Sequence, residues 1–98
     1  MDGKAQHQAR KLAAKAWASL LPVTVLDRDN LPLATGRVKP DTEGDQHSFW
    51  PDAPANKDHL SANAAFVMYS DGRKIEVFDF HLCPNPYPPR HFDFRIRF

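Results

Sequence analysis

The chain has 98 residues, a net charge of +1 and a hydrophobic share of 42%, with aromatic residues making up 11%. These values fit one small globular domain, 1–98, and they exclude the strongly basic proteins that bind nucleic acid through charge alone. Cys83 is the only cysteine, so an intrachain disulfide is excluded and a reducing, cytoplasmic location is expected. No apolar run approaches the roughly 18 residues that a membrane span requires, so no membrane partner is expected.

The first predicted element is an amphipathic helix within residues 1–21. Alanines, leucines and Trp17 recur there at spacings of three and four, which makes one apolar stripe. Lys11 and Lys15 lie on the opposite side of this helix. Pro22 disfavours helical geometry at the residue before it and is expected to end the helix. We expect the helix to pack on the sheet that follows.

Residues 22–98 break into short extended runs that are separated by turn residues. The predicted strands cover 23–26, 33–39, 46–50, 63–70, 73–83 and 91–98, with a short helical turn at 57–61. The last run alternates apolar and polar residues to its end, which is typical of a strand with one buried face. Five to six such strands beside one N-terminal helix predict an α+β, mostly β fold: a small antiparallel barrel or rolled sheet.

The pair Asp71-Gly72 lies between two of these runs and predicts a two-residue type I′ hairpin turn. In the register that follows from it, one face of the hairpin carries four apolar residues. Together with the apolar face of the last strand, the predicted core contains Phe66, Met68, Ile75, Val77, Phe92, Phe94 and Ile96.

The alternation in the second hairpin strand breaks after Val77, because Phe78, Phe80 and Leu82 have the opposite parity. A β-bulge near Val77–Phe78 would rotate the strand and send both sets of residues to one core. Alternatively, both faces of the strand are covered, with the N-terminal helix on the outer face. The sequence leaves both explanations open.

His81, Cys83 and His91 form a weak metal-ligand pattern. His81 and Cys83 are two residues apart on a predicted strand and therefore share a face, and His91 follows a proline-rich loop. A zinc site normally has three or four protein ligands, and no paired CxxC motif is present. We therefore expect these residues to be ordinary surface or packed side chains, and we expect no metal or other cofactor.

Basic residues near the last strand form the second candidate site. Guanidinium groups and aromatic rings are typical of surfaces that bind phosphates or stacked bases. The candidate ligand-binding residues are Arg90, Arg95, Arg97, Tyr87, Lys11 and Lys15. Asp93 interrupts the arginine row, which weakens the electrostatic pattern. A barrel behind a basic segment is similar in outline to PilZ domains, but lysines replace their arginine pair and no D/N-x-S-x-x-G motif follows, so no family is assigned.

The chain contains no glycine-rich phosphate loop, nucleophile elbow or HExxH motif. The leading interpretation is therefore a non-enzymatic interaction or regulatory module. The first alternative is a protein that binds nucleic acid or a nucleotide through its Arg/Lys face, and the second is a small enzyme whose site is assembled only in the fold. The expected partner is another protein or a second copy of the chain, paired through the edge of the C-terminal strand.

Overall fold

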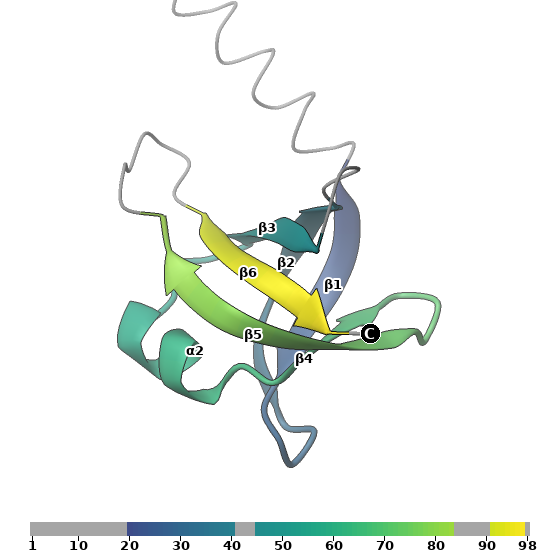
Figure 1. The fold of residues 1–98 in the computed structure, drawn as a ribbon, viewed down its shortest axis with the longest axis horizontal. Helices are drawn as coiled ribbons and strands as arrows, with labels where there is room; N and C mark the ends of the chain where they lie inside the picture. Colours follow the sequence, from purple (N-terminus) through teal and green to yellow (C-terminus); the bar gives the residue numbers. More distant parts are fainter. Residues whose placement is uncertain (1–19, 41–44, 84–90, 98) are drawn as a thin grey trace, which may run out of the picture.

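The computed structural model describes residues 20–40, 45–83 and 91–97. In these residues the strands close into an antiparallel barrel in the order β1-β2-β3-β6-β5-β4 (Figure 1). The elements are β1 (Leu21–Leu26), β2 (Pro32–Pro40), β3 (Gln46–Pro51), α2 (Lys57–Asn63), β4 (Phe66–Tyr69), β5 (Lys74–Leu82) and β6 (Phe92–Arg97). The prediction of a small antiparallel barrel with mostly β structure is confirmed.

The helix that the described residues contain lies in the middle of the chain, not at its N-terminus. Residues 1–19, where the principal helix is expected, lie outside the described residues. Leu21 already belongs to β1, so the predicted helix end at Pro22 is wrong. The restriction that proline places on the preceding residue favours extended geometry, which is the geometry that a strand requires.

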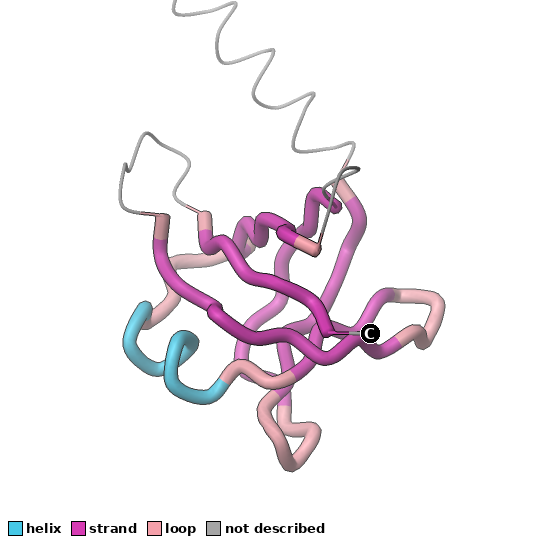
Figure 2. The backbone as a smooth tube through the Cα atoms, in the orientation of Figure 1, coloured by secondary structure: helices cyan, strands magenta, loops and turns pink. Residues whose placement is uncertain are grey.

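Helix α2 confirms the short helical turn expected at 57–61 and extends it by two residues. The side chain of Asn56 caps it by accepting a hydrogen bond from the backbone N–H of His59 at 2.9 Å. Leu60 is 2% exposed and packs into the barrel core. The helix lies beside β5 (Figure 2) and covers that side of the barrel.

Alternate residues of the strands fill the barrel interior. The largest fully buried side chains are Phe49, Phe94, Leu60, Val25, Val38 and Val67. Phe80 stacks on Phe92 and Phe94 with ring centroids 5.2 and 5.4 Å apart. Phe92, Phe94, Ile96 and Val77 are all buried, which confirms that the apolar face of the last strand belongs to the core.

The turn between β4 and β5 has three residues, 70–72, instead of the predicted two. Tyr69 N–H donates to the Arg73 carbonyl at 2.8 Å, and Gly72 N–H donates to the Tyr69 carbonyl at 2.9 Å. Gly72 has a φ of 93°, which is typical of the left-handed residue that follows a type I turn in such loops. The Asp71 carboxylate accepts the backbone N–H of Arg73 at 3.0 Å, and this bond lowers the pKa of that carboxyl.

The extra loop residue changes the predicted register of the hairpin. Phe66 pairs with Glu76 and Met68 pairs with Lys74, so the predicted pairs are wrong. Because a shift of one residue exchanges the two faces of a strand, Met68 is exposed and Phe66 is only half-buried. Ile75 is half-buried and packs at the margin of the core.

Strand β5 contains an irregularity that confirms the bulge explanation. The pairing of β5 with β6 shifts between Phe78 and His81, and Asp79 has a φ of 50°. One extra residue on β5 therefore lets both Val77 and Phe80 point inward, and both are buried. The shift comes after Phe78, so Phe78 stays opposite Arg95 on the outer face and does not join the core as expected. The positive φ lies at Asp79.

Closure of the barrel leaves β6 without a free edge. This strand pairs with β3 on one side and with β5 on the other (Figure 1). The expectation that residues 92–97 offer an unpaired edge to a second chain is therefore wrong. The sequence shows that the strand has one buried face, but it does not show how many neighbours the strand has.

Candidate functional site

Cys83, His91 and Asp93 lie together on the outer surface of the barrel, where β5 ends and β6 begins. The backbone N–H of Cys83 donates to the His91 carbonyl at 3.0 Å, which pairs the two residues. Phe92 points into the core, so His91 and Asp93 on either side of it project outward together. One potential ligand atom from each of the three side chains lies within 4.8 Å of the other two, and all three residues are half-buried.

Two residues of the neighbouring strand β3 contact this cluster. The Ser48 hydroxyl donates to Oδ1 of Asp93 at 3.2 Å, and the same oxygen lies 3.2 Å from Nε2 of His91. The indole of Trp50 stacks on the His91 ring, with centroids 4.7 Å apart and an interplanar angle of 27°. The positions of the His91 ring and the Asp93 carboxylate are therefore restricted by their neighbours.

The cluster of Cys83, His91 and Asp93 differs by one residue from the metal-ligand pattern that the sequence predicts. Cys83 and His91 come together, but Asp93 takes the place of His81. Nδ1 of His81 lies 2.7 Å from the carbonyl oxygen of Asp79, and the side chain is exposed. The sequence predicts Asp93 only as an interruption of the arginine row, although Asp93 lies two residues from His91 and therefore shares its face.

The arginines of β6 lie together on the outer surface, but each has a carboxylate partner. Nε of Arg95 is 3.4 Å from Asp45, and Nε of Arg97 is 3.9 Å from Glu76. Both guanidinium groups also lie over the ring of Phe78, at 5.8 and 4.2 Å from its centroid. The other candidate residues, Arg90, Tyr87, Lys11 and Lys15, lie outside the described residues.

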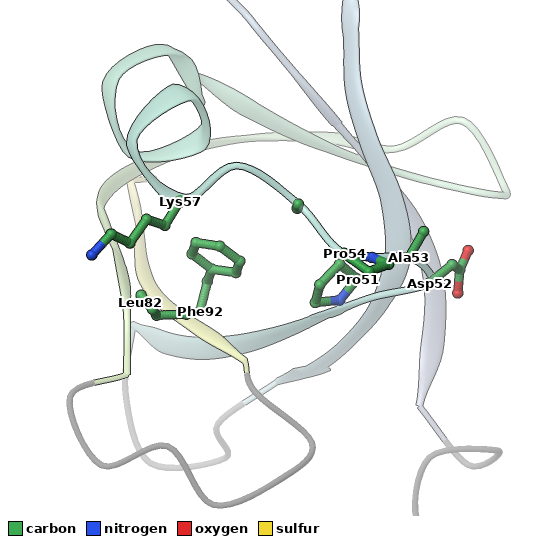
Figure 3. Close-up of a pocket in the computed structure, with 8 residues that line it drawn as sticks. Pro51, Asp52, Ala53, Pro54, Lys57, Leu82 and Phe92 are labelled. Carbon is green, nitrogen blue, oxygen red and sulfur yellow. The ribbon is translucent and has the colours of Figure 1, made fainter.

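A pocket of about 470 Å³ opens at the end of the barrel, where β3 leads into α2 (Figure 3). Its lining residues are Pro51, Asp52, Ala53, Pro54, Ala55, Lys57, Leu82 and Phe92. Phe92 is 2% exposed and forms the floor, whereas Lys57 and Asp52 are exposed charged residues of the rim. Small-molecule sites in proteins typically have volumes of roughly 300–1,000 Å³.

No sequence motif marks the residues of this pocket. They come from the β3–α2 connection, from the end of β5 and from the start of β6, and only the closed barrel brings them together. The available sequence signal is the segment Pro51–Ala55, because prolines and alanines at the mouth of a barrel have side chains too short to fill it.

Among residues 20–40, 45–83 and 91–97, no helix is long and apolar enough to cross a membrane. Comparisons of the chain with protein-family models, with curated proteins and with solved structures find no match. Because a fold by itself does not determine function, the chemistry of the site residues must carry any functional proposal.

Proposed function

We propose that this chain is a non-enzymatic binding module that takes a small amphipathic anion in the barrel-end pocket. The supporting observation is the pocket of about 470 Å³ with Phe92 as its floor and the ammonium group of Lys57 at its rim. An apolar group that covers Phe92 and Leu82 gains about 25 cal/mol for each Å² removed from water. The flexible stem of Lys57 lets its ammonium reach an anionic head group near the rim.

The shape and charge of the rim favour a monoanion. Pro51 and Pro54 form one wall, and their fixed φ angles keep that wall stiff (Figure 3). Lys57 lies on one side of Phe92, whereas Asp52 lies beyond the prolines on the other side. A second negative charge on the ligand would be repelled by Asp52, so an aliphatic carboxylate fits this rim better than a phosphate dianion.

The described residues favour this pocket over the basic face. Arg95 and Arg97 are each balanced by a carboxylate, which reduces the attraction of this surface for nucleic acid. Cys83 is a free thiol, which suits the reducing cytoplasm that we include in this proposal.

The experiment is an NMR titration of the ¹⁵N-labelled chain with octanoate. We expect saturable shifts at the backbone amides of Lys57, Leu82 and Phe92. Lys57→Gln is expected to weaken binding about 5-fold, because an exposed ion pair contributes up to about 1 kcal/mol. Ala53→Phe is expected to block the pocket and abolish binding.

Lys39→Gln is the matched control, because Lys39 is an exposed lysine of β2 outside the pocket. This variant is expected to bind octanoate like the unmodified chain. The proposal is overturned if octanoate causes no saturable shifts at the pocket amides or if Ala53→Phe binds normally. Equal binding of neutral octanamide would show that Lys57 does not select an anion.

A further inference from the structure

We propose that Cys83, His91 and Asp93 form a zinc-binding site on the outer wall of the barrel. The three side chains offer a sulfur, a nitrogen and an oxygen atom, each of which is a common zinc ligand. A mixed set with a thiolate and an imidazole favours zinc over magnesium or calcium, which prefer oxygen ligands. This inference does not depend on the proposed function of the pocket.

The spacing of the cluster is close to that of a tetrahedral metal site. With zinc–ligand bonds of about 2.0–2.3 Å, neighbouring ligand atoms in a tetrahedron lie roughly 3.3–3.7 Å apart. Nε2 of His91 and Oδ1 of Asp93 are already 3.2 Å apart. The three potential ligand atoms lie within 4.8 Å of one another, so contraction by about 1 Å brings all three to bonding distance.

The surroundings hold the ligands in place before any ion binds. The Cys83–His91 backbone hydrogen bond fixes the two strand ends side by side. Ser48 donates to Asp93, and Trp50 stacks on His91, so two of the three ligands have a partner from β3 that orients them. Such outer contacts strengthen metal sites because they remove the need to order each ligand when the ion binds.

Three protein ligands leave a fourth position for water or for an atom of an external ligand. The ligands are half-buried, so an ion can reach them from solvent. Leu82 and Phe92 adjoin the site along their strands and line the pocket on the inner side of the wall. A zinc ion would therefore join β5 to β6 directly behind this part of the pocket.

The experiment uses the full chain without an affinity tag, reduced, stripped with a chelator and titrated anaerobically with Co²⁺. We expect one Co²⁺ per chain, with the visible bands of a tetrahedral site and a near-ultraviolet sulfur-to-cobalt charge-transfer band. Zn²⁺ is expected to displace Co²⁺ and to remove both features. Circular dichroism of every metal-free variant checks that it folds.

The variants separate ligands from their neighbours. Cys83→Ser is expected to remove the charge-transfer band, and Asp93→Asn is expected to weaken Co²⁺ binding at least about 10-fold. Ser48→Ala keeps all three ligands and is expected to weaken binding about 10-fold while the charge-transfer band remains. His81→Gln is the matched control, since His81 is an exposed histidine of the same strand, and it is expected to change nothing.

Three results would overturn the zinc proposal. The first is the absence of stoichiometric Co²⁺ binding to the folded chain. The second is a Co²⁺ spectrum that Cys83→Ser leaves unchanged, and the third is equal loss of binding in His81→Gln. If the first result comes with rapid alkylation of Cys83 that His91→Gln slows, the cluster is a reactive thiol–imidazole pair instead. The octanoate titration is performed on metal-free protein, so either proposal can fail alone.

Discussion

Replacement of Gly36 by alanine tests how β2 packs against β3. The added Cβ would lie 2.2 Å from the carbonyl oxygen of Trp50 and 2.6 and 2.8 Å from two ring carbons of Phe49. Phe49 is fully buried and the carbonyl belongs to a paired strand, so neither group moves aside without disturbing the barrel. Overpacking costs about 1–3 kcal/mol, and contact with backbone places Gly36→Ala at the upper end, so we expect a loss of about 3 kcal/mol in unfolding free energy.

Urea denaturation followed by tryptophan fluorescence measures this loss. Gly72→Ala is the matched control. A Cβ at this position would meet no atom within 4 Å, but the backbone φ of 93° is unfavourable for alanine. It is expected to lose only about 1 kcal/mol. Gly36→Ala is expected to cost less in a Phe49→Leu background than in the unmodified chain, since the ring contact is then absent. A Gly36→Ala variant that is as stable as Gly72→Ala would refute the close approach of the two strands.

Two further predictions concern buried polar groups. Burial raises the pKa of the Tyr69 hydroxyl above 10.0, so the unfolded chain ionises first and the folded state loses stability above about pH 10. Urea denaturation across this range is expected to show a smaller loss in Tyr69→Phe, and an equal loss would contradict the assignment. His47 is 6% exposed, and its Nδ1 has no hydrogen-bond partner among the described residues. His47→Leu is therefore expected to raise the unfolding free energy by about 1 kcal/mol, whereas His59→Leu at the surface is expected to change it by less than about 0.5 kcal/mol; a destabilised His47→Leu would contradict this reasoning.

Local sequence patterns predict the strands of this barrel well and their registers less well. The alternation in residues 92–97 identifies a half-buried strand because burial repeats every second residue. The hairpin register was wrong because a glycine with positive φ suits both a two-residue type I′ turn and a three-residue loop, and Gly72 occupies the latter. The sequence pattern alone does not distinguish loops that differ by one residue.

The candidate site is predictable only in part, because local sequence patterns do not show which strands become neighbours. Cys83 and His91 stand out by residue type, but only the closed barrel shows that their strands are neighbours. Asp93 lies two residues after His91, so its side chain projects from the same face of β6. The pocket was not predicted, because Lys57, Leu82 and Phe92 come from three elements and meet only when the barrel closes.

The bulge at Asp79 determines which side chains at the end of β5 point into the barrel and which point outward. Beyond this point the strand has already exchanged its faces once, so Leu82 reaches the pocket and Cys83 reaches the outer surface. Deletion of His81, just beyond the bulge, would move Leu82 opposite Asp93 on the outer face and Cys83 opposite Phe92 on the pocket side. Substitutions can therefore alter the apolar wall or the sulfur ligand separately. A change in the number of residues between the bulge and Leu82 alters both at once.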